Sequence, residues 1–252
     1  MVVIVACGLW LGYYAVDSQH QKQTYETLAK DFLLEEPKSS LSLEDNSSGE
    51  SSAAGETMAT LTTVPPRHDL AALQAENSDC VGWLTIPDTT VDYPVVWTPE
   101  KPEHYLRRDF YGNHASGGTP FLDGRNQARA EGQNLILYGH NMLDGSMFQP
   151  VLQYFTPNFQ VTHEDIYLEL NGAQYHYQVL AALETNTRSP VYTYTDLSGT
   201  AEMEDFRATL LEETGLDAVP QAEGYLTLST CNNQGGNSRV LVIAALVEEV
   251  QR

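Results

Sequence analysis

The chain has 252 residues, 42% of them hydrophobic, which is enough for one sizeable domain with a buried core and some additional segments. Its formal net charge of −21, from 34 acidic and 13 basic residues, argues against binding to nucleic acid or to anionic lipid headgroups, because both need a basic surface. The three cysteines, Cys7, Cys80 and Cys231, are too few and odd in number for a disulfide framework, and no Cys/His cluster in the sequence indicates zinc.

The chain opens with an apolar run, MVVIVACGLWLGYYAV, that carries no charge before Asp17. The run is slightly shorter than the about 20 residues of a membrane-spanning helix, and it lacks the basic start and clear cleavage site of a signal peptide. We interpret residues 1–16 as an N-terminal signal anchor and expect its basic, cytosolic beginning to precede Met1. The alternative is a buried strand or helix of the globular domain.

Residues 17–66 are expected to connect this anchor to the domain. Gln19–Leu34 contains helix formers and spaced apolar residues, and it predicts a juxtamembrane helix. Glu35–Pro66 is rich in Ser, Glu, Thr, Ala and Pro and has almost no large apolar residues. Such a segment buries too little apolar surface to offset the entropy of ordering, so we expect a disordered linker. The globular domain then spans residues 67–252.

The domain is expected to consist mainly of short strands. The strand segments are bounded by Gly, Asn, Asp or Pro, as strands in β-rich folds are. They are Val81–Ile86, Thr90–Val96, Gly118–Leu122, Asn134–Tyr138, Ile166–Leu170, Gln174–Leu183, Tyr225–Thr230 and Arg239–Val247. Helical spacing appears in His68–Asn77 and again in Ala201–Glu213. Many short strands with few helices predict a closed or nearly closed β-barrel.

Cys231 ends the predicted strand YLTLSTC and precedes a polar, Gly-rich loop, NNQGGNSR. A cysteine at a strand end can meet a substrate, and its thiolate forms readily beside a cation or a hydrogen-bond donor. Arg239 opens the next apolar strand, and a hairpin between the two strands would bring it close to Cys231. Its planar guanidinium can hold a substrate carbonyl or a developing oxyanion. The alternatives are a buried thiol and a surface charge; we expect Cys7 and Cys80 to be buried and unreactive.

His140 follows the apolar strand Asn134–Tyr138 and Gly139, so we expect it in a loop at a strand end. An imidazole in that position can protonate a leaving amine and later deprotonate an attacking amine. The alternative is a structural histidine. Because the chain has seven histidines, a Cys/His pair alone is weak evidence for catalysis.

Four segments of the domain carry a family resemblance. TLSTC, followed shortly by an Arg that opens an apolar strand, resembles the active-site signature of sortases. YGHNMLDGSMF resembles the histidine segment of class B sortases, and VGWLTIPDTTVDYPVVW and GGTPFLDGRN resemble the first two strands and the next segment of that class. The resemblance covers essentially all of residues 68–250, and the predicted helix Ala201–Glu213 also matches class B.

The resemblance implies an eight-stranded sortase-type β-barrel with an N-terminal helix and a helix in the long connection before the nucleophile strand. It implies a cysteine transpeptidase that needs neither a metal nor an organic cofactor. Cys231 would attack the Thr carbonyl of a C-terminal sorting motif, with His140 as general acid and base and Arg239 as the clamp on substrate or oxyanion. The acceptor would be an amine of the peptidoglycan or a lysine of a pilin.

The same resemblance suggests candidates for the substrate groove, namely Leu106, Tyr192, Tyr194 and Ser229. Pro102 stands where some relatives have a polar Asn, so no groove role is carried over to that position. Together with the anchor, the resemblance implies a single-pass protein of a Gram-positive cell membrane, with the catalytic domain outside the cell. It would attach surface proteins to the cell wall.

Two other functions remain open at this point. A thiol hydrolase or peptidase would use the same Cys/His chemistry but release the peptide to water. A non-catalytic binding module on a stalk would need only the linker and the acidic surface. Transfer to an added amine would distinguish the transpeptidase from both.

Overall fold

The computed structural model describes residues 2–34, 64–232 and 236–251, with side-chain burial from residue 12 onward. The strands are β1 (Cys80–Thr85), β2 (Asp92–Val96), β3 (Phe121–Leu122), β4 (Asn134–Tyr138), β5 (Asp165–Leu170), β6 (Ala173–Asn186), β7 (Tyr225–Cys231) and β8 (Ser238–Glu249). They close into one barrel in the order β1-β2-β3-β4-β7-β8-β6-β5. The predicted mainly-β, eight-stranded barrel is confirmed.

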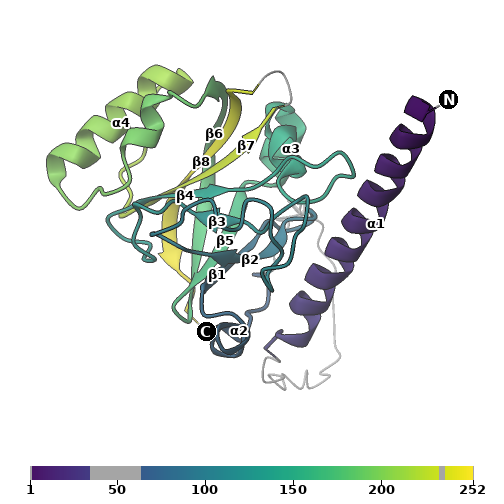
Figure 1. Ribbon diagram of the computed structural model, residues 1–252. Helices are drawn as coiled ribbons and strands as arrows, with labels where there is room; N and C mark the ends of the chain where they lie inside the picture. Colours follow the sequence, from purple (N-terminus) through teal and green to yellow (C-terminus); the bar gives the residue numbers. More distant parts are fainter. Residues whose placement is uncertain (1, 35–63, 233–235, 252) are drawn as a thin grey trace, which may run out of the picture.

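Helices surround the barrel (Figure 1). They are α1 (Val2–Asp31), α2 (Leu70–Glu76), the 3-10 helix η1 (Gln149–Phe155), α3 (Pro157–Thr162), the 3-10 helix η2 (Pro190–Thr193) and α4 (Thr200–Thr214). The predicted helix in the long connection before β7 is confirmed as α4. The short helices η1, α3 and η2 were not predicted from the sequence, because each is too short to show a helical repeat of apolar residues.

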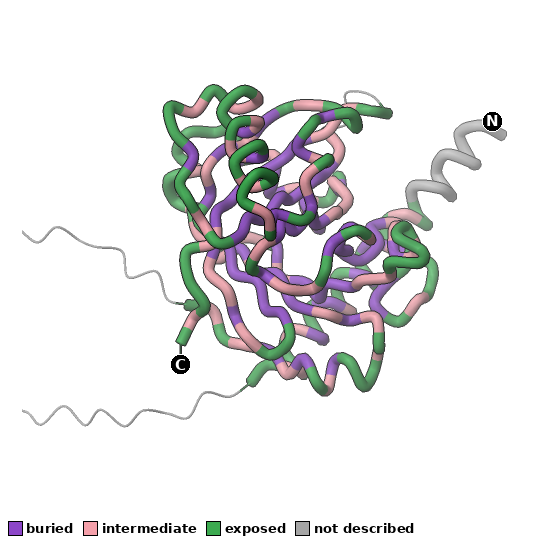
Figure 2. Tube along the Cα trace, turned by 90° about the vertical axis from the view of Figure 1, so that its left-hand side faces the viewer, coloured by how far each residue is buried: buried purple, intermediate pink, exposed green. Residues whose placement is uncertain are grey.

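Strands β7 and β8 are buried on both faces, which explains why they are apolar nearly throughout. Side chains alternate along a strand, so Val240 and Val242 of β8 point into the barrel while Leu241 and Ile243 point outward. The outward side chains form a second cluster with Phe206 of α4. Figure 2 shows the resulting buried segments at the centre of the molecule and the exposed segments at its edge.

Strand β3 is shorter than expected. The sequence predicts a strand over Gly118–Leu122, but the strand contains only Phe121 and Leu122, so the first half of that prediction is wrong. Gly118 has a φ of +62°, a left-handed conformation that an extended strand does not allow. Its carbonyl instead accepts hydrogen bonds from the side chains of Gln21 and Tyr25 in α1.

Helix α1 continues through both the segment interpreted as an anchor and the segment predicted as a juxtamembrane helix. One face of its second half is buried against the barrel, and its members are Ser18, Gln21, Tyr25 and Leu28. The sequence predicts a domain that begins at residue 67, and in the structure the second half of α1 also packs against that domain. Among the described residues, no helix is both long and apolar enough to cross a membrane. Most of the predicted linker, residues 35–63, lies outside the described residues.

Candidate active site

The barrel brings the ends of three strands to one edge. Strand β4 pairs with β7 in parallel, with Tyr138 beside Ser229, and each strand then leads within two residues to His140 or Cys231. Strand β7 pairs with β8 in antiparallel fashion, with Cys231 directly opposite Arg239. The predicted hairpin between Cys231 and Arg239 is therefore confirmed.

His140, Cys231 and Arg239 line a single cavity of about 500 Å³. Three of the four predicted groove residues, Leu106, Tyr192 and Ser229, also line it. The fourth, Tyr194, is not among the lining residues. The structure thus gathers the three predicted catalytic side chains and most of the predicted groove.

Tyr194 lies on the outer side of the barrel wall. Its ring packs against Phe206 of α4, with ring centroids 5.6 Å apart, and its hydroxyl accepts a hydrogen bond from Thr209. Pro102, to which no groove role was carried over, lines the cavity. Tyr192 and Tyr194 are the same residue type two positions apart, and the sequence alone does not show which of them faces the cavity.

The ring of His140 is held by the backbone of the preceding long loop. Its Nε2 lies 2.9 Å from the carbonyl oxygen of Leu106. A carbonyl only accepts, so Nε2 carries the proton and Nδ1 is the nitrogen that can exchange one. Burial lowers the pKa of His140; the Leu106 carbonyl opposes this, and the charges of Arg107 and Arg239 lower the pKa further. The imidazole is therefore mostly neutral at pH 7.

Cys231 is partly exposed, whereas Cys80 is fully buried. Burial raises the pKa of the Cys80 thiol to about 12, so this side chain is unreactive, as the sequence predicts. The side chain of Cys7 lies outside the described part of the chain. Asn141 donates a hydrogen bond of 3.0 Å to the carbonyl of Cys231 and so joins the loop after His140 to the end of β7.

Arg239 is oriented by its own turn. Its terminal nitrogen NH1 donates to the carbonyls of Gly236 and Ser238, at 3.1 and 2.9 Å. These two bonds fix the plane of the guanidinium beside Cys231. A fixed, always charged donor at this place can stabilise negative charge on a substrate oxygen.

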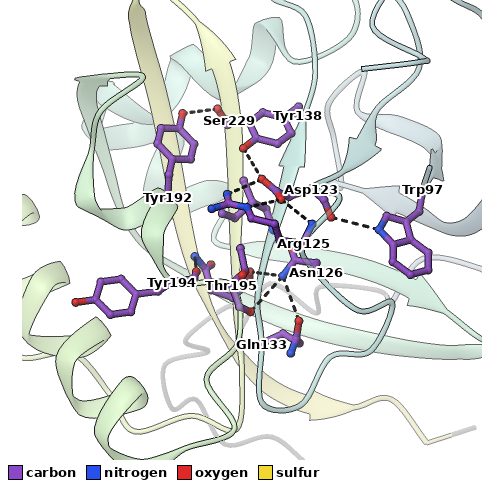
Figure 3. A network of polar contacts seen from close by, with 12 residues as sticks. Trp97, Asp123, Arg125, Asn126, Gln133, Tyr138, Tyr192, Tyr194, Thr195 and Ser229 are labelled. Carbon is purple, nitrogen blue, oxygen red and sulfur yellow. Dashed lines mark hydrogen bonds and ion pairs between the residues drawn. The ribbon is translucent and has the colours of Figure 1, made fainter. Parts of the chain in front are cut away.

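A polar network that the sequence analysis did not identify forms one wall of the cavity (Figure 3). Arg125 binds Asp123 with two hydrogen bonds, of 2.9 and 2.8 Å, and Tyr138 donates a third of 2.8 Å to the same carboxylate. Burial alone would raise the pKa of Asp123, but these hydrogen bonds outweigh it and lower the pKa. The signal in the sequence is the tripeptide Asp-Gly-Arg directly after β3, in which an acidic and a basic residue are two positions apart.

A second pair of hydroxyl groups lies on the neighbouring wall. The hydroxyl of Tyr192 is 2.7 Å from Oγ of Ser229, and the rings of Tyr192 and Tyr138 are nearly parallel, with centroids 6.2 Å apart. Burial raises the pKa of Tyr192, and the hydrogen bond with Ser229 opposes it in part. Both walls thus present fixed hydrogen-bonding groups over an aromatic surface, as a groove for an extended peptide requires.

Within the described residues, no group of three or more His, Cys, Asp or Glu side chains could hold a metal ion. The chemistry that these residues support is nucleophilic attack by a thiol, proton transfer by an imidazole and stabilisation of an oxyanion by a guanidinium.

Comparisons with known proteins agree with this chemistry. Residues 84–247 match the family model described as a sortase domain. The chain is similar to sortase B of Listeria monocytogenes, with 34% identity over 171 residues that cover 67% of this chain and 69% of the relative. It is also similar to sortase B of Staphylococcus aureus, with 30% identity over 192 residues that cover 72% of this chain and 76% of the relative.

Solved structures give the same result. A Staphylococcus aureus sortase B–substrate complex is similar to this chain with a TM-score of 0.63 and 28% sequence identity, over 71% of this chain and 84% of that chain. Both the fold and the sequence of the barrel therefore resemble those of class B sortases.

Proposed function

This chain belongs to the sortase family, and on that premise we propose that it cleaves a C-terminal sorting motif at its Thr residue and passes the acyl group to an amine. It is a cysteine transpeptidase of the class B type. The proposal concerns the residues that perform the reaction, the motif and the acceptor. We assign Cys231 as the nucleophile, His140 as the general acid and base, and Arg239 as the oxyanion clamp.

In the first step Nδ1 of neutral His140 takes the proton of the Cys231 thiol, and the resulting thiolate sulfur forms a bond to the Thr carbonyl carbon. The carbonyl oxygen takes up the negative charge, and the guanidinium of Arg239 stabilises it. The carbon–nitrogen bond then breaks, and protonated His140 gives its Nδ1 proton to the leaving amine. The products are a thioester on Cys231 and the released C-terminal peptide.

In the second step an amine attacks the thioester carbonyl. Neutral His140 accepts the proton of the attacking amine, a carbon–nitrogen bond forms, and the sulfur of Cys231 leaves. We propose that this amine belongs to the peptidoglycan or to a lysine of a pilin, as the family resemblance implies. The attacking amine must be uncharged and must reach the cavity.

The observation that carries the assignment is the single cavity lined by Cys231, His140 and Arg239, which come from two strand ends and one loop. The test is incubation of the protein with a quenched sorting peptide, of NPxTx or LPxTG-like form, with and without an added amine. We expect a ligated product that depends on the amine and that disappears in the Cys231→Ala variant. Release of the peptide to water alone would favour a thiol hydrolase. An intact thiol with no turnover would favour a binding module.

The place of action is a further part of the proposal. We propose that the catalytic domain lies outside the cell and that residues 1–16 anchor it in the membrane. The support is the uncharged apolar run at the start of the chain and the polar composition of Glu35–Pro66. Fractionation of cells that express the full chain, with protease added to intact cells, tests it. Protein found in the cytosolic fraction and protected from protease would contradict the proposal.

A further inference from the structure

Helix α1 contacts two chain segments that support His140, namely the turn before β3 and the turn after His140. The contact residues are four positions on one helical face, and they are Asp17, Ser18, Gln21 and Tyr25. Gln21 and Tyr25 are 5% and 3% exposed, although one has a polar amide and the other a hydroxyl. Buried polar groups of this kind need hydrogen-bond partners, and here the partners lie far away in the sequence.

The first set of partners is the turn that precedes β3. The amide of Gln21 accepts from the backbone nitrogen of Gly117 at 3.1 Å and donates to the carbonyl of Gly118 at 2.6 Å. The hydroxyl of Tyr25 donates to the same Gly118 carbonyl at 2.8 Å and lies 2.8 Å from Oγ1 of Thr119. Asp17 accepts from the backbone nitrogen of Ser116 nearby. The turn is therefore bonded to side chains of α1 on one side, and on the other side to the segment that contains Tyr105 and Arg108.

The same turn supports the carbonyl that binds His140. The backbone nitrogen of Thr119 donates to the carbonyl of Tyr105 at 3.2 Å. Gly118 lies so close to this strip that an added Cβ would be 2.6 Å from the carbonyl oxygen of Tyr105 and 2.5 Å from that of Leu106. The Leu106 carbonyl in turn accepts the proton of His140 Nε2. A continuous chain of contacts thus leads from α1 through Gly118 and Leu106 to the imidazole.

Helix α1 also holds the segment that follows His140. The hydroxyl of Ser18 donates to the carboxylate of Asp144. Asp144 accepts in addition from the backbone and side chain of Ser146, at 3.1 and 2.6 Å. This turn returns to the site, because the backbone nitrogen of Phe148 donates to the carbonyl of His140 at 2.8 Å. The histidine is consequently supported by α1 on both sides.

We propose that Gln21 and Tyr25 are positioning residues for His140: they fix the turn at Gly118, and through it the Leu106 carbonyl that orients the imidazole ring. The inference rests on the proposed function only in that His140 is taken as the acid and base. Proton transfer requires a defined position of Nδ1, and a misplacement of about 1 Å can reduce a rate by a factor on the order of 10². Helix α1 would thereby belong to the catalytic unit and not to the tether.

The experiment uses two single-substitution variants of the full chain. Gln21→Ala removes both amide contacts, and Tyr25→Phe removes the hydroxyl but keeps the buried ring and its edge contact with Tyr93. The matched control is Gln23→Ala, since Gln23 is the same residue type on the exposed face of the same helix. Three measurements are made on each variant: steady-state kinetics with the sorting peptide, which give kcat and KM; the NMR signal of the His140 ring; and the thermal midpoint.

We expect kcat to fall roughly tenfold in each test variant with KM little changed, because no α1 residue is among the described residues that line the cavity. The His140 ring signal should move in both, and the Gln23→Ala control should match the parent in all three measurements. A lowered thermal midpoint with kcat and ring signal unchanged would overturn the proposal, because α1 would then serve stability alone. A fall in kcat without movement of the ring signal would overturn it as well.

Failure of the proposed function would look different. If His140→Ala kept full turnover, the assignment of His140 as acid and base would be wrong. The ring signal in Gln21→Ala and Tyr25→Phe would still show whether α1 orients the imidazole.

Discussion

Replacement of Arg239 by Lys separates two ways in which this side chain can assist Cys231. One way is geometric, in which the planar guanidinium holds a substrate oxygen. The other is a general positive potential that favours the thiolate. Lysine keeps the charge but loses the planar fork, so the two accounts predict different results for the variant.

The structure indicates how large the geometric effect should be. The NH1 group of Arg239 donates to the carbonyls of Gly236 and Ser238, and these two bonds hold the plane of the fork beside Cys231, the residue with which Arg239 pairs. A Lys ammonium has its donors on a single nitrogen, so if it keeps the two carbonyls it offers the substrate no second donor nitrogen in a fixed plane. Loss of one oriented oxyanion donor typically costs about 10²–10³ in kcat, or about 2.7–4 kcal/mol. Because Arg239 is only partly buried, water can replace it in part, and we expect about 10².

The assay compares two rates in the same variant. Turnover of the sorting peptide reports on acylation, and the rate of alkylation by iodoacetamide as a function of pH reports on the thiolate of Cys231. If the role is geometric, Arg239→Lys alkylates with nearly the parental pH profile while turnover falls by about 10². Turnover close to the parental value in Arg239→Lys would refute the geometric role.

Three further predictions concern the nucleophile, the groove and the wall of the cavity. Cys231→Ala should abolish peptide turnover and amine transfer with an unchanged thermal midpoint, while Cys80→Ala, in the buried core, should keep turnover; activity in Cys231→Ala would contradict the assignment. Tyr192→Phe should raise KM roughly three- to tenfold, because it removes a hydroxyl that faces the cavity, whereas Tyr194→Phe, outside the cavity, should leave KM unchanged. Asp123→Asn should lower the free energy of unfolding at pH 7 by about 1–2 kcal/mol, a value reduced for the exposure of its Arg partner. Folding lowers the pKa of Asp123, so this stabilisation is complete above about pH 4 and is lost as the pH falls. The free energies of urea unfolding of parent and variant should therefore converge in acid. A difference that persists at low pH would argue against the ionised carboxylate as its source.

The strands that pack on both faces were the most predictable part of the molecule. Asn134–Tyr138 was predicted with its observed bounds, and the strand that ends at Cys231 differs by one residue. Continuous apolar runs bounded by turn residues leave little freedom in where such a strand begins and ends. For the same reason the strand-end positions of Cys231 and His140 could be predicted from sequence.

The features that were missed depend on polar contacts between distant segments. Gln21 looks like a solvent-exposed helix residue in the sequence, and its burial becomes visible only with Gly117 and Gly118 in place. The pair Asp123 and Arg125 likewise becomes meaningful through Tyr138, which comes from another strand. Hydrophobic periodicity carries no information on such pairs, because their partners are set by the tertiary fold.

The nucleophile and the histidine are positioned by different parts of the structure. Strand β7 is paired on both sides, with β4 as far as Ser229 and with β8 through Cys231, so the sulfur is placed by the barrel itself. His140 lies beyond the end of β4, and its position depends on the Leu106 carbonyl, on the backbone of the turn that follows it, and through both on α1. Changes at the periphery should therefore affect proton transfer while leaving the thiol reactive. Alkylation of Cys231 at the parental rate in a Gln21→Ala variant with reduced turnover would be the expected sign of this division, and a matching loss of both would argue that the site is positioned as one unit.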